Sequence, residues 1–237
     1  MYLELKRGDV SKYVLLTGNP ARAKLAASML SNNEKVSENR EFLVFRGYYG
    51  DLEVTVCSAG MGAPSTAVAI EELVRAGCKV LIRAGTMIGV NAGLGEIIIS
   101  TGAVRKEGTS PTYVELGYPA VPDFLILESL VRSAEKAGVK FKVGISSSFD
   151  GFYSEMRNKQ VLKCLREVGV LGCDMETSLV LTLCNILRVR GGSACLVTVD
   201  SLGRCLDSEE RSKLEKSLVK LVLDAFTFIN KETGGMP

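Results

Sequence analysis

Segments with the apolar pattern of strands alternate along the chain with segments that have the apolar periodicity of helices. Short apolar runs rich in branched side chains, as in buried strands, lie at residues 13–17, 79–84, 96–101, 141–146 and 194–199. Apolar residues recur at helical spacing in residues 21–30, 65–76, 122–137, 154–168, 173–187 and 209–230. Residues 42–48 and 52–57 flank a Tyr-Gly-Asp turn and predict a hairpin. Residues 231–237 are expected to form a frayed tail.

This alternation predicts an α/β fold with a mixed or parallel sheet between layers of helices. The 237 residues contain no low-complexity linker, so we expect residues 1–237 to form a single domain. Two of the predicted strands run into Gly18 and Gly85. In such folds, ligands bind at the carboxyl ends of the strands, and these glycines mark the expected site.

The overall charge limits the classes of binding partner that we expect for this protein. The 29 basic and 27 acidic residues give a net charge of +2, so no overall field attracts a nucleic acid or a membrane. Any bound anion must therefore be held by local groups. The first ten residues lack the apolar core of a signal peptide, and no apolar stretch approaches membrane-spanning length. We expect a cytoplasmic protein.

The chain contains no histidine and seven cysteines. Without histidine there is no Ser-His-Asp triad, no Cys-His pair and no histidine-based metal site, so acid–base work falls to Asp, Glu, Lys, Tyr or Cys. The cysteine count is odd and no C-x-x-C pair occurs, which predicts neither a metal site nor a disulfide scaffold. Most of the thiols are expected to be buried, and a disulfide would fit only a hyperthermophilic source.

The segment around Gly18 has the chemistry of an anion site. A strand ends at this glycine, a tight turn follows, and Arg22 lies in the first turn of the next helix. Bare backbone at Gly18 and the positive helix end favour a bound oxyanion, which the guanidinium of Arg22 would complete. The alternative is an ordinary strand–turn–helix with a solvated arginine.

A second arginine, Arg83, lies inside an apolar strand, where an isolated charge is costly. It needs an anion or an acidic partner. Gly85 and Thr86 follow directly and would supply bare backbone and a hydroxyl to an oxyanion. The competing interpretation pairs Arg83 with Glu71 or Glu72.

Acidic residues mark two further places. Asp174 and Glu176 open a predicted helix, where the dipole favours carboxylates, but Glu176 would equally accept hydrogen bonds from sugar hydroxyls while Met175 packs on the sugar. Asp200 follows a buried strand. In a chain without histidine it is the natural general acid, with burial raising its pKa; the alternative is an aspartate that initiates a turn.

Short motifs then occur in a characteristic order: GNPAR, ENREF, GMGAPS, EEL, IRAGT, YPAVPDF, FYS and DMET. From Tyr2 to the last helix the chain resembles the hexameric nucleoside phosphorylases, which include purine nucleoside phosphorylases, uridine phosphorylases and archaeal relatives. The resemblance implies a mixed, partly closed sheet with helices on both faces. It also implies reversible phosphorolysis of nucleosides to free base and (deoxy)ribose 1-phosphate, without a metal or organic cofactor. The expected assembly is a homohexamer, a trimer of dimers with shared sites.

The family's site residues transfer by motif. The resemblance implies phosphate binding by Gly18, Arg22, Arg83 and Thr86, with Arg40 reaching across from a neighbouring subunit. The ribose contacts would be Met175, Glu176 and Tyr2. The base contacts would be Phe152, Asp174, Gly60 and Asp200. Arg83 and Asp200 would be the catalytic residues, with protonated Asp200 neutralising the leaving base.

Three positions depart from the family pattern. Asn19 stands where the family usually has aspartate, and Tyr2 stands where a histidine commonly reaches the neighbouring ribose. Ile88 replaces a glycine and would reshape the base pocket.

The residues just after the FYS motif predict the base. Uridine phosphorylases read uracil there with a glutamine and an arginine, whereas this chain has Met156 and Asn158, with Arg157 between them. Together with Asp200 this favours purine nucleosides. Uridine remains an alternative, because a one-residue shift would restore Arg157, and methylthioadenosine is another. The more distant alternatives are a nucleosidase, against which the arginines argue, and a non-catalytic nucleotide-binding module.

Overall fold

The computed structural model describes residues 1–157 and 159–234, without the side chains of residues 155–159. Within this part the chain forms one nine-stranded sheet in the order β2-β3-β4-β1-β5-β8-β7-β6-β9. The strands are β1 (Tyr13–Thr17), β2 (Ser31–Asn39), β3 (Phe42–Tyr49), β4 (Leu52–Ser58), β5 (Val80–Gly89), β6 (Ile97–Lys106), β7 (Phe141–Phe149), β8 (Gly172–Asp174) and β9 (Arg190–Asp200). Because β5 pairs with both β8 and β9, half of the sheet closes into a barrel. The predicted mixed, partly closed sheet is confirmed.

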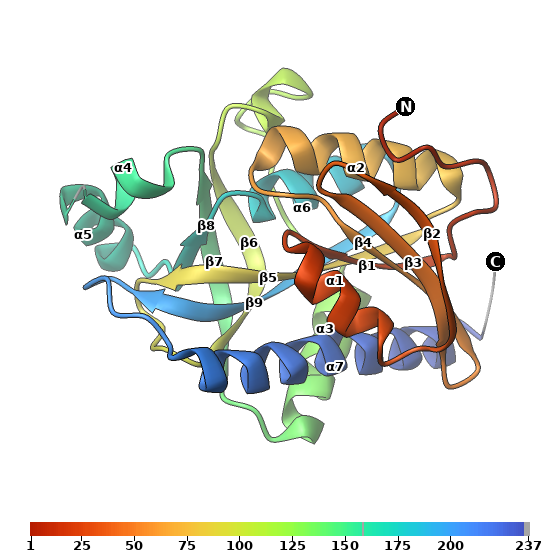
Figure 1. The fold of residues 1–237 in the computed structure, drawn as a ribbon. Helices are drawn as coiled ribbons and strands as arrows, with labels where there is room; N and C mark the ends of the chain where they lie inside the picture. Colours follow the sequence, from red (N-terminus) through yellow and green to blue (C-terminus); the bar gives the residue numbers. More distant parts are fainter. Residues whose placement is uncertain (158, 235–237) are drawn as a thin grey trace.

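Helices cover both faces of this sheet (Figure 1). Helices α1 (Pro20–Ala27), α3 (Phe124–Ala137) and α7 (Ser208–Glu232) lie on one face, and α2 (Ala63–Ala76) and α6 (Thr177–Ile186) on the other. Helices α4 (Phe152–Arg157) and α5 (Lys159–Glu167) pack at the barrel end, and a short 3-10 turn spans Ser110–Thr112. None of the helices in the described residues is long and apolar enough to cross a bilayer.

Alternation along β1 explains the two cores. Leu15 points to the layer that contains α7, while Val14 and Leu16 point to the layer that contains α2 and α6. All three side chains are almost fully buried. A strand with apolar residues on both faces is stable only between two helical layers, which is how the continuous apolar run predicted the sheet.

The structure differs from the predicted helix at 173–187. This helix begins at Thr177, and the preceding Gly172–Asp174 form strand β8. The carboxylate of Asp174 accepts the backbone N–H groups of Glu176 and Thr177, a local bond by which aspartate competes with helix formation. Gly172 fits against the barrel because a Cβ there would lie 2.8 Å from the carbonyl oxygen of Ile88.

Two further segments depart from the pattern. Strand β2 was not predicted, because its sequence SNNEKVSEN is almost entirely polar; it is an edge strand, where polar residues are common. The described parts of the helix predicted at 154–168 are α4 and α5, and Asn158 between them lies outside the described residues. The closing helix extends to Glu232, beyond the predicted start of the frayed tail, and residues 235–237 lie outside the described residues.

Candidate active site

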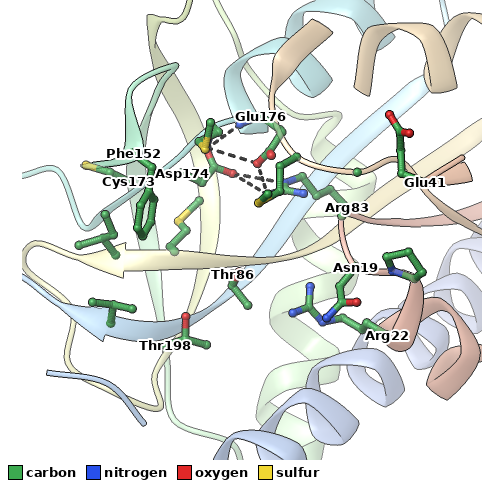
Figure 2. A pocket seen from close by; sticks show the side chains of 18 of the residues that line it. Asn19, Arg22, Glu41, Arg83, Thr86, Phe152, Cys173, Asp174, Glu176 and Thr198 are labelled. Atoms are coloured by element: carbon green, nitrogen blue, oxygen red, sulfur yellow. Dashed lines mark hydrogen bonds and ion pairs between the residues drawn. The ribbon is translucent and has the colours of Figure 1, made fainter. Parts of the chain in front are cut away.

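A cavity of about 680 Å³ opens at the carboxyl ends of β1, β5 and β9 (Figure 2). It brings together nine of the sequence-predicted residues: Gly18, Arg22, Gly60, Arg83, Thr86, Phe152, Asp174, Met175 and Glu176. Arg22 lies at one end of the cavity and Phe152 at the other. The site therefore has a cationic end and an apolar end.

Arg22 is buried and fixed in place by three elements. Its Nη1 donates to Thr17 Oγ1 at 3.1 Å and to the Ala84 carbonyl at 3.3 Å, and its Nη2 donates to Glu215 Oε1 at 2.8 Å. Its Nε has no partner among the described residues. With 3% of its surface exposed, Arg22 is not the solvated arginine of the alternative interpretation.

The turn before Arg22 has little room for side chains. A Cβ on Gly18 would lie 2.8 Å from the Gly60 carbonyl oxygen, so only glycine lets the two loops approach. Asn19 begins helix α1, with its Oδ1 accepting the N–H of Ala21 at 2.9 Å. The departure from the family's aspartate therefore keeps a good helix cap and removes a negative charge from the cationic end.

Arg83 forms two buried ion pairs. Its Nε and Nη2 contact Asp174 Oδ2 at 3.2 and 3.1 Å, and its Nη2 contacts Glu176 Oε2 at 2.6 Å (Figure 2). Burial acts to lower the pKa of Arg83, but the charges of Glu176 and Asp174 outweigh it and raise that pKa. Arg83 is therefore a permanent cation at the cavity wall.

The alternative partners of Arg83 are engaged elsewhere. Glu71 pairs with Arg75 at 3.2 Å, and Glu72 accepts the backbone N–H groups of Tyr2 and Leu3. The structural pairing of Arg83 with either glutamate is therefore wrong.

Asp174 is surrounded by protein donors. Its Oδ1 accepts from Ser148 Oγ at 2.6 Å and from the N–H of Thr177 at 3.1 Å, while Oδ2 accepts from Arg83 and from the Thr177 hydroxyl. Only 2% of its side chain is exposed. These bonds support a positioning role of Asp174 toward Arg83, and its predicted contact with the base stays a prediction.

Glu176 lines the cavity beside Arg83. Its Oε1 accepts the N–H of Gly62 at 2.6 Å, which ties the loop after β4 to the site. Burial raises the pKa of Glu176, although the charge of Arg83 opposes this shift. Met175 flanks the carboxylate, with its Cε 3.9 Å from where a Gly62 Cβ would lie. An acceptor beside an apolar thioether suits a sugar, as the sequence predicted.

The far end of the cavity is apolar. Phe152, Ile88 and Val199 pack in one cluster with Cys173, and all four line the cavity. Ile88, the departure from the family's glycine, is only 2% exposed and forms part of this wall. The surface suits a flat heterocycle.

Asp200 lies outside this cavity, in a neighbouring hollow. Its Oδ1 accepts the N–H groups of Leu202 and Arg204 at 2.9 Å, and its Oδ2 accepts from Arg204 Nε at 2.6 Å. Burial acts to raise the pKa of Asp200, but these bonds outweigh it and lower that pKa. The predicted raised pKa is wrong, and the turn-initiating interpretation of Asp200 is confirmed.

Arg40 and Tyr2 also lie away from the cavity of their own chain. Arg40 occupies the exposed turn between β2 and β3 with a φ of 53°, and its guanidinium lies 5.5 Å from the ring centre of Tyr2. Their contacts across a subunit boundary stay predictions. The side chains of Met156 and Arg157, and all of Asn158, lie outside the described residues.

Among the cavity residues that sequence reasoning missed, three have polar or charged side chains: Glu41, Thr198 and Arg211. Glu41 follows Arg40 in the ENREF motif, which gave a signal for it. Thr198 lies in an apolar run and Arg211 in an amphipathic helix, where each had an ordinary structural explanation.

The prediction that most of the thiols are buried is confirmed. Five are buried, Cys164 and Cys205 are exposed, and the described residues contain no disulfide. The same residues contain no cluster of three His, Cys, Asp or Glu side chains suited to a metal ion.

Buried arginines, a central carboxylate and an apolar slot in a half-closed α/β sheet define an enzyme that holds an anion against a nucleoside. A sequence profile of the phosphorylase superfamily matches residues 12–227, and the chain belongs to this family as a nucleoside phosphorylase, a pentosyltransferase. It is 37% identical over 211 residues to a uridine phosphorylase of Thermococcus kodakarensis, covering 83% of this chain and 76% of the relative. It is 32% identical over 236 residues to a guanosine phosphorylase of Halorubrum lacusprofundi, covering 95% and 97%. The solved uridine phosphorylase of Vibrio fischeri superposes with a TM-score of 0.88 at 31% identity, covering 94% of this chain and 95% of that chain.

Proposed function

We propose that the protein is a uridine phosphorylase that releases uracil and forms ribose 1-phosphate. Phosphate binds at the cationic end, between Gly18, Arg22 and Thr86 on one side and Arg83 on the other. The ribose hydroxyls bind Glu176. The base lies in the apolar slot, and no metal or organic cofactor takes part.

Positioning and electrostatics carry the reaction. Cleavage of the glycosidic bond builds positive charge on the sugar and negative charge on the base. Phosphate held by Arg22 and Arg83 stabilises the sugar cation and attacks C1′, while Glu176 fixes the sugar. Arg83 stays charged throughout, because its pKa is raised by its two carboxylate partners.

The position of Asp200 is the observation on which we choose the base, and it argues against the purine preference predicted from the sequence. A purine leaves most readily when an acid protonates N7. Asp200 is outside the cavity, bonded to Arg204, and its pKa is lowered, so it is ionised at neutral pH. Uracil, by contrast, leaves as a delocalised anion that needs only hydrogen bonds. The Thermococcus kodakarensis relative and the Vibrio fischeri structure support this choice.

Guanosine is the second candidate, because the Halorubrum lacusprofundi relative that aligns over 97% of its length is a guanosine phosphorylase. A substrate panel of uridine, guanosine, inosine, adenosine and methylthioadenosine, with and without phosphate, separates the possibilities. We expect the highest kcat/KM with uridine, and only with phosphate present. A higher value with a purine nucleoside would refute the uridine assignment. Base release without phosphate would indicate a nucleosidase, and no release a binding module.

We further propose that Arg40 of a neighbouring subunit completes the phosphate site within a homohexamer. Its exposed turn between β2 and β3, adjacent to the cavity residue Glu41, supports this arrangement. Arg40→Ala and Arg83→Ala variants should each be inactive alone. Mixing them after dissociation should restore a fraction of the sites, and no recovery would count against a shared site. A cytoplasmic location stays a prediction.

A further inference from the structure

Strand β9 contains one residue more than its neighbour β5 where the two strands border the cavity. Met87 pairs with Val197 and Ile88 pairs with Val199, so Thr198 has no partner in the ladder. The Leu206 N–H, donating to the Thr198 carbonyl at 3.0 Å, anchors this bulge. Bulges next to active sites re-aim side chains.

The bulge changes which side chains reach the cavity. Successive residues of a regular strand point to opposite faces, so only one of two neighbours would line a site. Here both Thr198 and Val199 line it. Val199 joins the apolar cluster with Ile88 and Phe152, and Thr198 adds the adjacent hydroxyl.

The hydroxyl of Thr198 has no hydrogen-bond partner among the described residues, although the residue is only 7% exposed. Because this oxygen is not one of the fully buried polar atoms, it is open to the cavity, where a bound ligand can hydrogen-bond to it. Figure 2 shows Thr198 on the strand beside Thr86, farther from Arg22 and next to the apolar end. Of the two hydroxyls, that of Thr86 is therefore nearer to the cationic end and that of Thr198 nearer to the apolar end.

We propose that Thr198 is a specificity-determining residue whose hydroxyl hydrogen-bonds to a polar edge atom of the bound base. The inference rests on the proposed function. The apolar wall contacts the faces of the heterocycle and distinguishes bases poorly, whereas a hydroxyl that donates and accepts discriminates between edge atoms. The bulge fixes this hydroxyl on a rigid strand.

Thr198→Val, which removes the hydroxyl at nearly constant shape, is the direct test. We expect about a 5- to 10-fold fall in kcat/KM for uridine, the effect of one neutral hydrogen bond, with the KM for phosphate unchanged. Thr198→Ser should restore most of the lost activity. Thr182→Val is the matched control, because Thr182 is buried in α6 with an unpartnered hydroxyl and does not line the cavity.

Thio-substituted nucleosides test the contact at the level of the base. Sulfur is a weak acceptor. For each protein we compare kcat/KM for 2-thiouridine or 4-thiouridine with kcat/KM for uridine. In the wild-type enzyme this ratio should be well below one for one of the two thionucleosides. In Thr198→Val the same ratio should be about 5-fold closer to one. An increase in the KM for phosphate, or equal ratios in both proteins, would overturn the inference. An inactive wild type with every nucleoside would overturn the proposed function as well, whereas a normally active wild type and an unchanged variant would overturn this inference alone.

Discussion

Replacing Asp174 with asparagine tests the assignment of this residue as the support of the site. The carboxylate accepts bonds from Arg83, Ser148 and Thr177, and both of its oxygens face donors. The amide of an asparagine has one acceptor and one donor end, so the donor end must face another donor whichever way it turns. Glu176 still compensates the charge of Arg83 at 2.6 Å.

The expected loss follows from this geometry. Removal of a buried ion-pair partner costs about 3–5 kcal/mol when the other charge is left alone. Because Glu176 remains, the loss is closer to that of a charged hydrogen bond with one mismatched donor, about 2–3 kcal/mol. For a chain of this size that corresponds to a fall in Tm of roughly 5–10 °C. A displaced Arg83 should also raise the KM for phosphate by about 10-fold, since small misplacements are costly.

Calorimetry and initial-rate kinetics measure the two effects. Asp207→Asn is the matched control, because Asp207 caps α7 through the N–H groups of Glu209 and Glu210 and asparagine caps equally well. A Tm for Asp174→Asn within about 2 °C of wild type, with an unchanged KM for phosphate, would refute the positioning role. A selective change in the KM for the nucleoside would favour the original base-contact prediction.

Further outcomes are expected from the same contacts. Gly85→Ala should lower stability by about 1–3 kcal/mol and weaken phosphate binding, because its Cβ would lie 2.7 Å from Arg83 Cζ; Gly93→Ala, with ordinary contacts only, should leave both unchanged. Because burial raises the pKa of Glu176, kcat/KM for the nucleoside should fall on acidification at a pH above the ordinary value of 4.5, and Glu176→Gln should abolish that limb. Since folding favours the protonated form of this group, the group itself causes no loss of stability over the same acid range, as thermal melts should show. Of the seven thiols, only the two exposed ones should react rapidly with a disulfide reagent in the native protein, because burial raises the pKa of buried thiols such as Cys184, to about 12; more than two rapid thiols would refute this.

The sequence predicted elements whose burial leaves a periodic trace. Strand β1 and helix α7 lie within two residues of their predicted bounds, because each buries a regular apolar face. Strand β2 leaves no such trace, since its pairing with β3 depends on backbone bonds at a polar edge. The bulge at Thr198 also leaves no pattern in the sequence, because it depends on the register between two strands and not on one strand alone.

The hydrogen-bond partners of side chains were harder to predict than the ends of strands. The pattern placed Asp200 correctly at the end of a buried strand. The next four residues, however, turn back so that Arg204 and two backbone N–H groups take up its carboxylate. The partner of Asp174 was hard to predict for a different reason, because Arg83 is 91 residues away in the sequence. The contacts of Asp174 therefore depend on the assembled fold and have no local signal, whereas those of Asp200 lie within four residues and fit the turn-initiating alternative.

The charge balance of the cavity gives an independent reason for a shared site. Three arginines line it: Arg22, Arg83 and Arg211. All three are already paired: Arg22 and Arg211 with Glu215, and Arg83 with Asp174 and Glu176. Glu41, on the same wall, adds a further negative charge. Summed over these side chains, the cavity wall of one chain carries no net positive charge, although Arg22 and Arg211 share a single carboxylate at the cationic end. A further cation from outside would therefore strengthen phosphate binding. In the proposed shared site this charge would come from Arg40 of a neighbouring copy, which in its own chain is exposed on the turn directly before Glu41.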